Sequence, residues 1–326
     1  MELPPFISLY SLVSLYLAVV LDLSLGDGNY SFHPVRIMGA LISFSEKRFR
    51  ASGLHLKVAG CVMAIVLVGG TFFFISFLIN FMEQWSIWEG IFLSSLVIYF
   101  CLSLRCLGDE AIKVFRLLSR GKLNEARKQL SFLVSRDTKD MDVADISRSS
   151  IETVAENFVD GVISPFFYAF IFGPAMAMAF KMASTLDSMI GYKTDEFKDL
   201  GFFSAKLDDF LNFIPARLCL FFIFLAGLLF HKKNPFVLFK EAKKYFTMSE
   251  SPNSGYPEAA FAVVLGVRLG GPTKYHGSLK YLPHINEDGE RPAPIHIKKS
   301  VILMYQSSLL FYLVPIFLYI FIALTF

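Results

Sequence analysis

The sequence predicts an all-α, polytopic integral membrane protein. Hydrophobic residues make up 54% of the 326-residue chain, and 36 residues are phenylalanine, whereas soluble domains are about 45–50% apolar. A membrane-spanning helix needs about 20 mostly apolar residues in a row. Four stretches reach that length, namely residues 6–25, 58–81, 87–107 and 301–326. We predict a transmembrane helix for each of them.

The first apolar stretch is predicted to be retained as a helix. No basic segment precedes it, and Asp22, Gly26 and Asp27 stand where a signal peptide would carry a small-residue cleavage site. The four cysteines, Cys61, Cys101, Cys106 and Cys219, lie in or beside apolar stretches without CxxC spacing. We therefore interpret them as small buried side chains, and neither a disulfide framework nor a zinc site is indicated.

Two further apolar stretches could either span the membrane or enter and return as re-entrant segments. Residues 161–183 are interrupted at Gly173-Pro174, where a helix should stop or kink. Residues 212–230 are apolar enough to span but carry Pro215 and Arg217 near their start. The sequence leaves both arrangements open.

The distribution of basic residues predicts the orientation of the chain. Lys and Arg are concentrated in residues 26–57 and 108–160, whereas the short connection 82–86 contains Glu83 and no basic residue. The positive-inside rule makes the first two loops cytoplasmic and places the connection and the N-terminus outside. Residues 231–299, rich in lysine, become a cytoplasmic loop region. The two ambiguous stretches must then both span or both re-enter.

We favour the re-entrant arrangement because it keeps all the polar clusters on the cytoplasmic side. The chain is then a single membrane-embedded domain, residues 1–326, with multiple passes through the cell membrane and functional loops in the cytoplasm. Residues 108–160 form a helical cytoplasmic segment within it. Residues 109–119 are amphipathic, Gly121 suits the left-handed position after a helix, and an apolar stripe continues to Val134.

A third helix in this segment is predicted over residues 143–158, with Asp142 as its N-cap. Glu152, Glu156 and Asp160 recur at a spacing of four residues, and Asp145 lies seven residues before Glu152. Such spacing places side chains on one face of a helix. A stripe of carboxylates is therefore expected along this helix.

Several common motifs are absent. The chain has no GxxxxGK[ST], HExxH or GxSxG sequence. Gly266, Gly270 and Gly271 do not follow a strand in a βαβ unit, so helix termination and close packing explain them better than a dinucleotide loop. Asp160-Gly161 begins like the DG…AR pattern of CDP-alcohol phosphatidyltransferases. Ser164-Pro165 stands where that pattern needs Ala-Arg, which excludes this class.

Four polar clusters interrupt the apolar sequence between Glu152 and Arg217: AENFVDG, STLDSMIGY, KLDDF and LNFIPAR. Ionisable groups inside a membrane cost a few kcal/mol and usually serve a function. Carboxylates suit magnesium bound together with substrate phosphates, or a general base. Simpler explanations remain open. Asp208-Asp209 could end a solvated helix, Thr185 or Asp187 could cap one, and Glu152 could pair with Arg148.

Arg36, Arg136 and Arg217 lie at the edges of polar clusters, and a guanidinium binds phosphate or carboxylate in a bidentate manner. Positive-inside anchoring is the competing explanation for Arg36. His33 is held extended by Pro34, and a structural role is the alternative to substrate contact.

Seven motifs follow one another along nearly the whole chain: LDLSLGDG with HPVRIMGALI, SRDT, AENFVDGVISPFFYAF, STLDSMIGY, KLDDFLNFIPARL and NSGYPEAAFAVVLGVRLGG. Taken in this order, they resemble the CbiB/CobD family of cobalamin biosynthesis, the adenosylcobinamide-phosphate synthases. Two positions depart from the family pattern. The family usually has GDP where this chain has Asp27-Gly28, and NTLDSM where it has Ser184-Thr185, which weakens any role for an amide at position 184.

The resemblance implies an ATP- and magnesium-dependent ligase. It would join a propionate carboxyl of adenosylcobyric acid to the amine of (R)-1-amino-2-propanol O-phosphate, or to free aminopropanol. Whether the carboxyl is activated as acyl phosphate or acyl adenylate stays open. Besides these substrates and the lipid bilayer, other cobalamin-assembly enzymes are candidate partners, and we expect no nucleic-acid partner. The oligomeric state is not predicted.

Residue roles follow from combining the clusters with the resemblance. The predicted catalytic residues are Glu156, Asp187, Asp208 and Asp209. The predicted magnesium ligands are Glu156, Asp160, Asp208 and Asp209. The predicted substrate contacts are His33, Arg36, Arg136, Asn157, Tyr192, Asn212, Arg217, Tyr256 and Glu258. The corrin ring is expected against the Phe-rich surface and residues 255–260.

Two other functions are alternatives to the ligase. A transporter or binding protein for a corrinoid or another anion could use the same carboxylates and the broken helix at Gly173-Pro174. A non-catalytic scaffold for other corrin enzymes could use them as buried hydrogen-bond networks. No internal inverted repeat favours transport.

Overall fold

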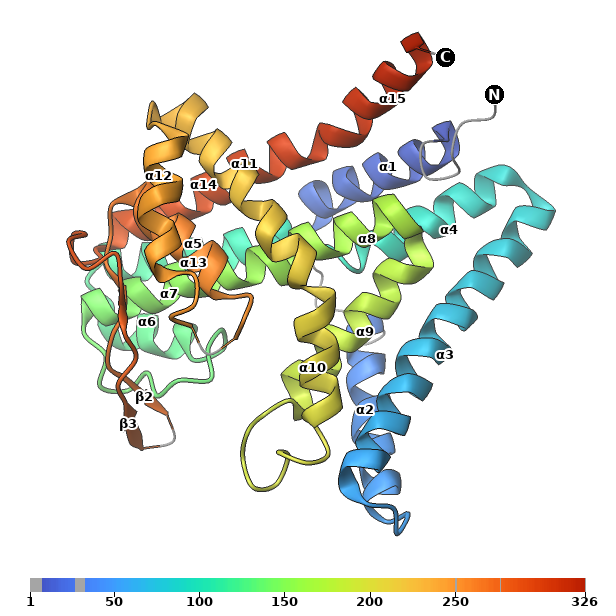
Figure 1. Ribbon diagram of the computed structural model, residues 1–326, viewed down its shortest axis with the longest axis horizontal. Helices are drawn as coiled ribbons and strands as arrows, with labels where there is room; N and C mark the ends of the chain where they lie inside the picture. Colours follow the sequence, from blue (N-terminus) through green and yellow to red (C-terminus); the bar gives the residue numbers. More distant parts are fainter. Residues whose placement is uncertain (1–7, 27–32, 250, 276, 326) are drawn as a thin grey trace. The chain divides into compact units, whose positions relative to one another are not determined.

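The computed structural model describes residues 8–26, 33–249, 251–275 and 277–325, and it confirms the all-α membrane fold (Figure 1). The chain forms two compact units. Unit 1 comprises Met1–Ser103, Asp160–Asn212 and Val314–Phe326, and unit 2 comprises Leu104–Val159 and Phe213–Leu313. Because the two units alternate along the sequence, neither is a contiguous piece of chain.

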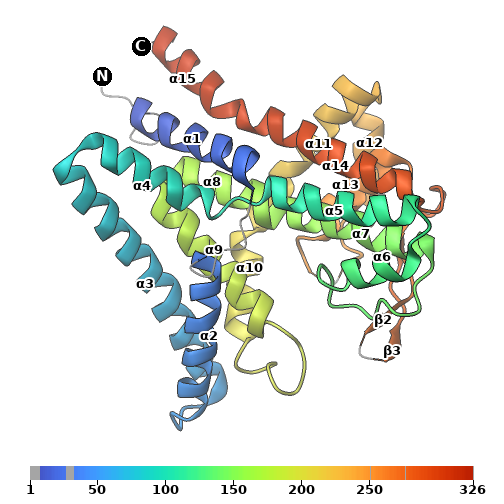
Figure 2. The same ribbon diagram turned by 180° about the vertical axis from the view of Figure 1, so that it is seen from behind.

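Unit 1 is built from helices that are mostly apolar. They are α1 (Leu9–Leu25), α2 (Pro34–Arg50), α3 (Leu56–Trp85), α4 (Ile87–Tyr99), α8 (Ser164–Phe172), α9 (Pro174–Ile190), α10 (Phe202–Leu211) and α15 (Val314–Thr325). Helix α9 packs against α3, α8, α10 and α2, and α1 lies beside α4, as both views show (Figure 2). Helix α9 is therefore the centre of this unit.

Unit 2 combines longer helices with short helices and strands. The helices are α5 (Leu104–Ser119), α6 (Leu123–Leu130), α7 (Val143–Phe158), α11 (Phe213–His231), α12 (Pro235–Ala242), α13 (Gly255–Leu265) and α14 (Pro294–Tyr312), with a 3₁₀ turn at Lys243–Tyr245. Helix α14 packs against α5, α7 and α11, and α13 packs against α11, α12 and α7. The buried rings of Phe158 and Phe261 meet where α7 and α13 touch.

In the described part of the chain, five helical runs are long and apolar enough to span a membrane: Leu56–Trp85, Ile87–Ser119, Val143–Phe172, Phe202–His231 and Pro294–Thr325. The predicted stretches 58–81 and 301–326 fall within two of them. The stretch 6–25 corresponds to α1, a shorter apolar helix, and its first two residues lie outside the described residues. The stretch 87–107 is divided, because α4 ends at Tyr99 and α5 begins at Leu104.

The predicted outside connection is shorter than expected. Helix α3 continues to Trp85, and Ser86 alone separates it from α4, where its Oγ accepts a hydrogen bond from the backbone N–H of Trp88 at 3.2 Å. Trp85 and Trp88 are 74% and 71% exposed. Exposed tryptophans beside the turn between two apolar helices are typical of a membrane–water interface.

The predicted interruption at Gly173-Pro174 is confirmed. Gly173 has φ of 85°, which ends α8, and Pro174 begins α9, so the two helices form a packed hairpin (Figure 1). A turn of π-helix, Val159–Ile163, leads into α8. Whether the hairpin spans the membrane or re-enters stays a prediction.

The expected helices of segment 108–160 are present, with one wrong boundary. Gly121 has the predicted positive φ, 72°, after α5. Helix α6 ends at Leu130 and does not reach Val134, because residues 131–133 form turns. The start of α7 is confirmed as a capping box, in which Asp142 accepts from the N–H of Asp145 at 2.8 Å and the Asp145 side chain reaches back.

Four short strands in residues 269–285 were not predicted. β1 (Leu269–Gly270) pairs antiparallel with β4 (His284–Ile285), and β2 (Thr273–Tyr275) pairs with β3 (Ser278–Lys280). Gly266 has φ of 73° and ends α13, which agrees with the predicted role in helix termination. The strands are only two or three residues long, so alternation in the sequence could not indicate them.

Candidate functional site

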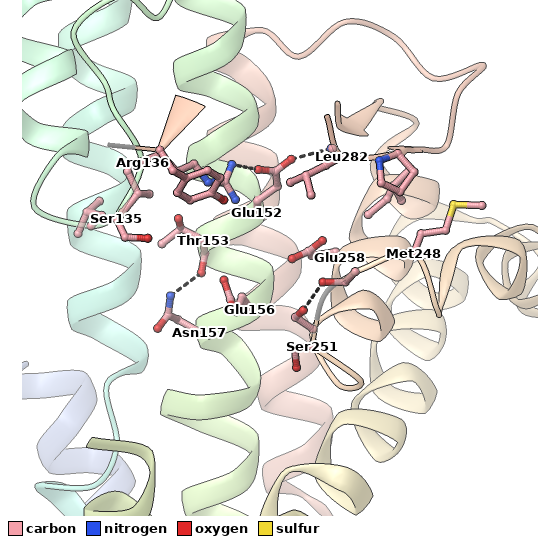
Figure 3. Close-up of a pocket in the computed structure, with 18 residues that line it drawn as sticks. Ser135, Arg136, Glu152, Thr153, Glu156, Asn157, Met248, Ser251, Glu258 and Leu282 are labelled. Carbon is pink, nitrogen blue, oxygen red and sulfur yellow. Dashed lines mark hydrogen bonds and ion pairs between the residues drawn. The ribbon is translucent and has the colours of Figure 1, made fainter. Parts of the chain in front are cut away.

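Helix α7 carries its polar residues into a cavity of about 300 Å³ in unit 2 (Figure 3). Glu152 and Glu156 lie on this helix at i and i+4, and with Thr153 and Asn157 they line the cavity. Arg136 lines it from the loop before α7, and Glu258 lines it from α13. The cavity therefore unites four residues predicted for the site, Arg136, Glu156, Asn157 and Glu258, with the carboxylate Glu152.

Glu152 pairs with Arg136, and not with Arg148 as the simpler explanation supposed. The Arg136 guanidinium bonds directly to a carboxylate oxygen of Glu152, and their side chains are 14% and 3% exposed. The other oxygen of Glu152, Oε1, accepts a hydrogen bond from the backbone N–H of Gly270 at 2.7 Å. Arg148 instead bonds to the backbone oxygens of residues 270 and 272.

Glu156 and Glu258 also line the cavity, and Figure 3 shows them below this ion pair with their carboxyl groups directed into the same space. Among the described residues, neither carboxylate accepts a hydrogen bond. Burial raises the pKa of Glu258 well above its usual range, and the nearby charges of Glu152 and Glu156 add to this effect, while Arg136 opposes it. Three carboxyl groups thus face one guanidinium. A cation bound in the cavity would favour the ionised form of the carboxyl groups that Arg136 does not pair with.

Asn157 lines the same cavity, but its side-chain amide donates to the backbone oxygen of Thr153 at 3.0 Å. The amide oxygen of Asn157 points away from this bond and can still accept one from a ligand. The predicted substrate contact stays a prediction.

Arg217 and Tyr256 form a second cluster in unit 2. The Arg217 guanidinium carbon lies 4.4 Å from the centroid of the Tyr256 ring and 3.5 Å from that of Phe213. Its Nη1 donates to the side-chain oxygen of Asn253 at 3.2 Å and to the backbone oxygen of Phe213 at 2.7 Å. The opposite side of Tyr256 is occupied by Phe246, whose ring centroid is 4.6 Å away. The ring of Tyr256 is therefore held between two neighbours.

In unit 1, Asp208 and Asn212 belong to a hydrogen-bonded chain at the end of α10. The amide nitrogen of Asn212 donates to Asp208 at 3.0 Å, and the hydroxyl of Ser164 donates to the amide oxygen at 2.6 Å. Tyr168 donates to the backbone oxygen of Leu211 at 2.8 Å. These hydrogen bonds account for the burial of Asn212, and they connect the end of α10, which carries KLDDF, to α8. Asp209 lies 3.7 Å from Lys206 in a half-exposed pair.

Asp187 lies in the last turn of α9, where its carboxylate packs against Gly191. A Cβ at position 191 would overlap Oδ1 of Asp187, which explains the glycine in STLDSMIGY. The expected alternative, N-capping by Thr185 or Asp187, is wrong. Both residues are within α9, and the Thr185 hydroxyl donates back to Lys181. Tyr192 follows the helix and is 48% exposed.

Asp160 precedes a glycine that has no room for a side chain. The backbone N–H of Ser103 donates to the oxygen of Gly161 at 2.9 Å, and a Cβ at Gly161 would overlap the Ser103 hydroxyl oxygen. The glycine of AENFVDG is therefore required for packing within unit 1.

His33 caps α2. Its Nδ1 accepts from the backbone N–H of Val35 at 3.3 Å, its ring meets Phe100 edge to face, and the side chain is buried. This is the structural role considered as the alternative. Arg36 follows on α2 with an exposed side chain. The preceding motif position, Asp27-Gly28, lies outside the described residues.

The predicted magnesium ligands are divided between the units, with Glu156 in unit 2 and Asp160, Asp208 and Asp209 in unit 1. Within the ranges the structure describes, no three His, Cys, Asp or Glu side chains are grouped as a metal site. Mg²⁺ often binds through one or two carboxylates and takes its remaining ligands from water and phosphates. The magnesium assignment stays a prediction.

Comparison with known proteins gives a consistent result. A family model described as CobD/Cbib protein matches residues 15–304. The cobalamin biosynthesis protein CobD of Clostridium perfringens is 41% identical over 279 residues, which cover 85% of this chain and 88% of that protein. The proteins of the same name from Photorhabdus laumondii and Clostridium tetani are 39% and 40% identical, over 91% and 92% of this chain and 94% and 95% of their own lengths. No solved structure matches.

Proposed function

Because the chain belongs to the CobD/CbiB family of cobalamin biosynthesis proteins, we propose that it is an ATP-dependent, amide-forming ligase. The proposed reaction joins a propionate carboxyl of adenosylcobyric acid to the amine of (R)-1-amino-2-propanol O-phosphate, giving adenosylcobinamide phosphate. With free aminopropanol the product is cobinamide. The proposed location is the cell membrane, with the reacting loops in the cytoplasm.

One observation carries the proposal: Glu152, Glu156 and Glu258 face a single arginine in a cavity of about 300 Å³. That volume is at the small end of the range for ligand pockets, about 300–1,000 Å³, so it suits a small aminoalcohol and not a corrin ring. An alkyl amine is protonated at neutral pH, as lysine is. The carboxylates of Glu156 and Glu258 are then the partners of the incoming ammonium group.

The same carboxylates can prepare the amine for reaction. An ammonium nitrogen has no lone pair, so it must lose a proton before the C–N bond forms. Glu258, whose pKa is raised by burial, is suited to accept that proton. The amine then attacks the activated carboxyl carbon, and the bond from this carbon to its leaving group breaks. ATP supplies that leaving group, and phosphate or adenylate would both serve.

The magnesium ion expected with ATP would neutralise phosphate charge, and carboxylates are its usual protein ligands. Glu156, Asp208 and Asp209 remain proposed ligands and catalytic residues, and Asp160 remains a proposed ligand. Asp187 remains a proposed catalytic residue, with its carboxylate positioned against Gly191. The Arg217–Tyr256 cluster and the 255–260 segment are proposed to contact the corrin, and His33, Arg36, Tyr192 and Asn212 its polar groups or the phosphates.

The decisive experiment is mass spectrometry of adenosylcobyric acid after incubation with aminopropanol phosphate, ATP, magnesium and the purified protein. We expect an amide product that depends on ATP, and separate reactions with free aminopropanol identify the accepted amine. Corrinoid uptake into proteoliposomes without any amide product would identify a transporter instead, the alternative consistent with the broken helix at Gly173.

Variants then test the residues. Glu258→Gln should lower the rate roughly 10²-fold, the lower end for loss of a general base, and Glu156→Gln should raise KM for the amine. Glu125→Gln, which removes an exposed carboxylate from α6, is the matched control.

Asp187→Ala and Asp209→Ala should abolish product formation, and normal turnover in either would refute its catalytic assignment.

A further inference from the structure

A second cavity in unit 2, of about 440 Å³, is lined mainly by basic side chains, whereas the first, the acidic cavity, is lined by Glu152, Glu156 and Glu258. The second cavity is lined by Arg148, Arg268, Arg291 and His284, with Asp145 as its one carboxylate. Three guanidinium groups therefore face one carboxylate. Arg291 also pairs with Asp142 of the α7 cap. Even with that pair counted, positive charge is in excess.

The local backbone is arranged to bring these side chains together. Gly270 of β1 lies opposite His284 of β4 in the antiparallel pair. Gly271 follows with φ of 86°, and a Cβ there would overlap the His284 ring and come within 3.1 Å of Nη1 of Arg148. Only glycine at 271 lets the imidazole and the guanidinium approach one another. The motif GVRLGG thus provides both a cavity arginine, Arg268, and the space beside it.

Two buried nitrogen atoms of this cavity have no hydrogen-bond partner among the described residues. They are Nε of Arg148, whose side chain belongs to a residue only 9% exposed, and Nδ1 of His284. A buried polar atom without a partner costs about 1–3 kcal/mol. The remaining Arg148 nitrogens bond to the backbone oxygens of Gly270 and Pro272 and, at 3.4 Å, to Asp145. An anion in the cavity would supply a hydrogen-bond partner for the buried nitrogen atoms that have none.

Arg268 is the side chain most available to a ligand. Its backbone N–H is fixed by the oxygen of Glu290 at 2.9 Å, which holds the residue at the cavity wall. Among the described residues its guanidinium has no hydrogen-bond or ion-pair partner. Arg148 and Arg291, by contrast, are partly engaged by Asp145 and Asp142.

We propose that this second cavity binds a phosphate group through Arg268, Arg148 and Arg291, with His284 as an additional donor. Guanidinium groups bind phosphate oxygens in a bidentate manner, which lysine cannot do. Two sources share this chemistry, the polyphosphate of a nucleotide and the phosphate of a phosphorylated aminoalcohol. The binding site stands on the geometry alone, and only the choice between these sources rests on the proposed function.

The test is isothermal titration of the purified, detergent-solubilised full chain with inorganic phosphate, ATP and aminopropanol phosphate, each without corrinoid. Arg268→Gln is the informative variant, because Arg148→Gln would also release the backbone of residues 270–272. Losing one charged hydrogen-bonding group should weaken phosphate binding roughly tenfold or more. Arg116→Gln, which removes an exposed arginine from α5, is the charge-matched control.

The outcomes are distinct. Weaker binding of ATP alone in Arg268→Gln assigns the cavity to a nucleotide, and weaker binding of aminopropanol phosphate alone assigns it to the amine substrate. Equal affinities of Arg268→Gln and Arg116→Gln for all three probes would overturn the proposal. Because no probe requires amide formation, a protein that binds phosphate here but makes no product would contradict the proposed function and leave the site intact.

Discussion

The guanidinium of Arg217 lies over the ring of Tyr256, with 4.4 Å between its central carbon and the ring centroid. Phe246 stacks on the same ring at 4.6 Å, and Asn253 accepts a hydrogen bond from Arg217. The first turn of α13 is thereby attached to α11. Two motifs far apart in the sequence, LNFIPAR and NSGYPEAA, meet in this contact.

Tyr256→Ala should destabilise unit 2 and weaken corrin binding. Removing the ring deletes a cation–π contact worth about 0.5–2 kcal/mol together with its packing on Phe246. Thermal unfolding measures the first effect and corrinoid titration the second. Tyr256→Phe keeps the ring and serves as the control. Unchanged corrinoid affinity in Tyr256→Ala would remove the corrin from this surface.

Arg136→Gln should be among the most destabilising single substitutions in the acidic cavity. It leaves the carboxylate of Glu152, 3% exposed, buried without its ion-pair partner. Breaking a buried pair in this way costs about 3–5 kcal/mol, to be measured as a loss of thermal stability. The double variant Arg136→Gln/Glu152→Gln should recover much of the loss. If the double variant is no more stable than the single one, the pair is not the cause.

The stability of the protein should depend on pH through Glu258. Its pKa in the folded protein is raised above the usual 4.5, so the folded state holds this proton more tightly than the unfolded state does. Folding stability is then lost as pH rises from that value through the folded pKa. Glu258→Gln carries no charge and escapes this loss. Its melting temperature should therefore rise relative to that of the parent as the pH increases above about 4.5.

The matched measurement uses Glu125→Gln over the same pH range. Its carboxylate is exposed on α6, so this variant controls for the loss of one glutamate outside the cavity. If the melting temperature of Glu258→Gln differs from that of the parent by the same amount at every pH, burial does not shift the titration of Glu258.

The re-entrant arrangement predicts that the loop after α9 faces the cytoplasm. Asp195 lies in this loop with its side chain 97% exposed, so a cysteine there should react readily with a maleimide. In intact cells, Asp195→Cys in a variant without the four native cysteines should resist a membrane-impermeant reagent and react after permeabilisation. Labelling of intact cells from outside would establish that both ambiguous segments span.

Features encoded within a few residues were predictable from sequence. The start of α7 depends on Asp142 and Asp145, and the end of α8 depends on Gly173 and the proline after it. Each is a local conformational preference of the backbone, so neighbouring residues are sufficient to indicate it.

The partners of the charged residues were not predictable in the same way. Glu152 was compared with Arg148 because both are on one helix, yet it pairs with Arg136 from the preceding loop and with the backbone of Gly270, which is 118 residues away in sequence. The second cavity, which is lined by arginines, was not predicted for the same reason. Arg268, His284 and Arg291 come from strands and turns with no periodic signal, and only the arginine in GVRLGG offered a hint.

Gly270 is held on both sides by one helix, since Glu152 accepts from its N–H and Arg148 donates to its oxygen. It also lines both cavities. A ligand that changes the position of either side chain must therefore act on the backbone that the other one holds. By thermodynamic linkage, a cation in one cavity and an anion in the other would alter each other's affinity by the same factor. This single residue would make the occupancy of the two cavities cooperative.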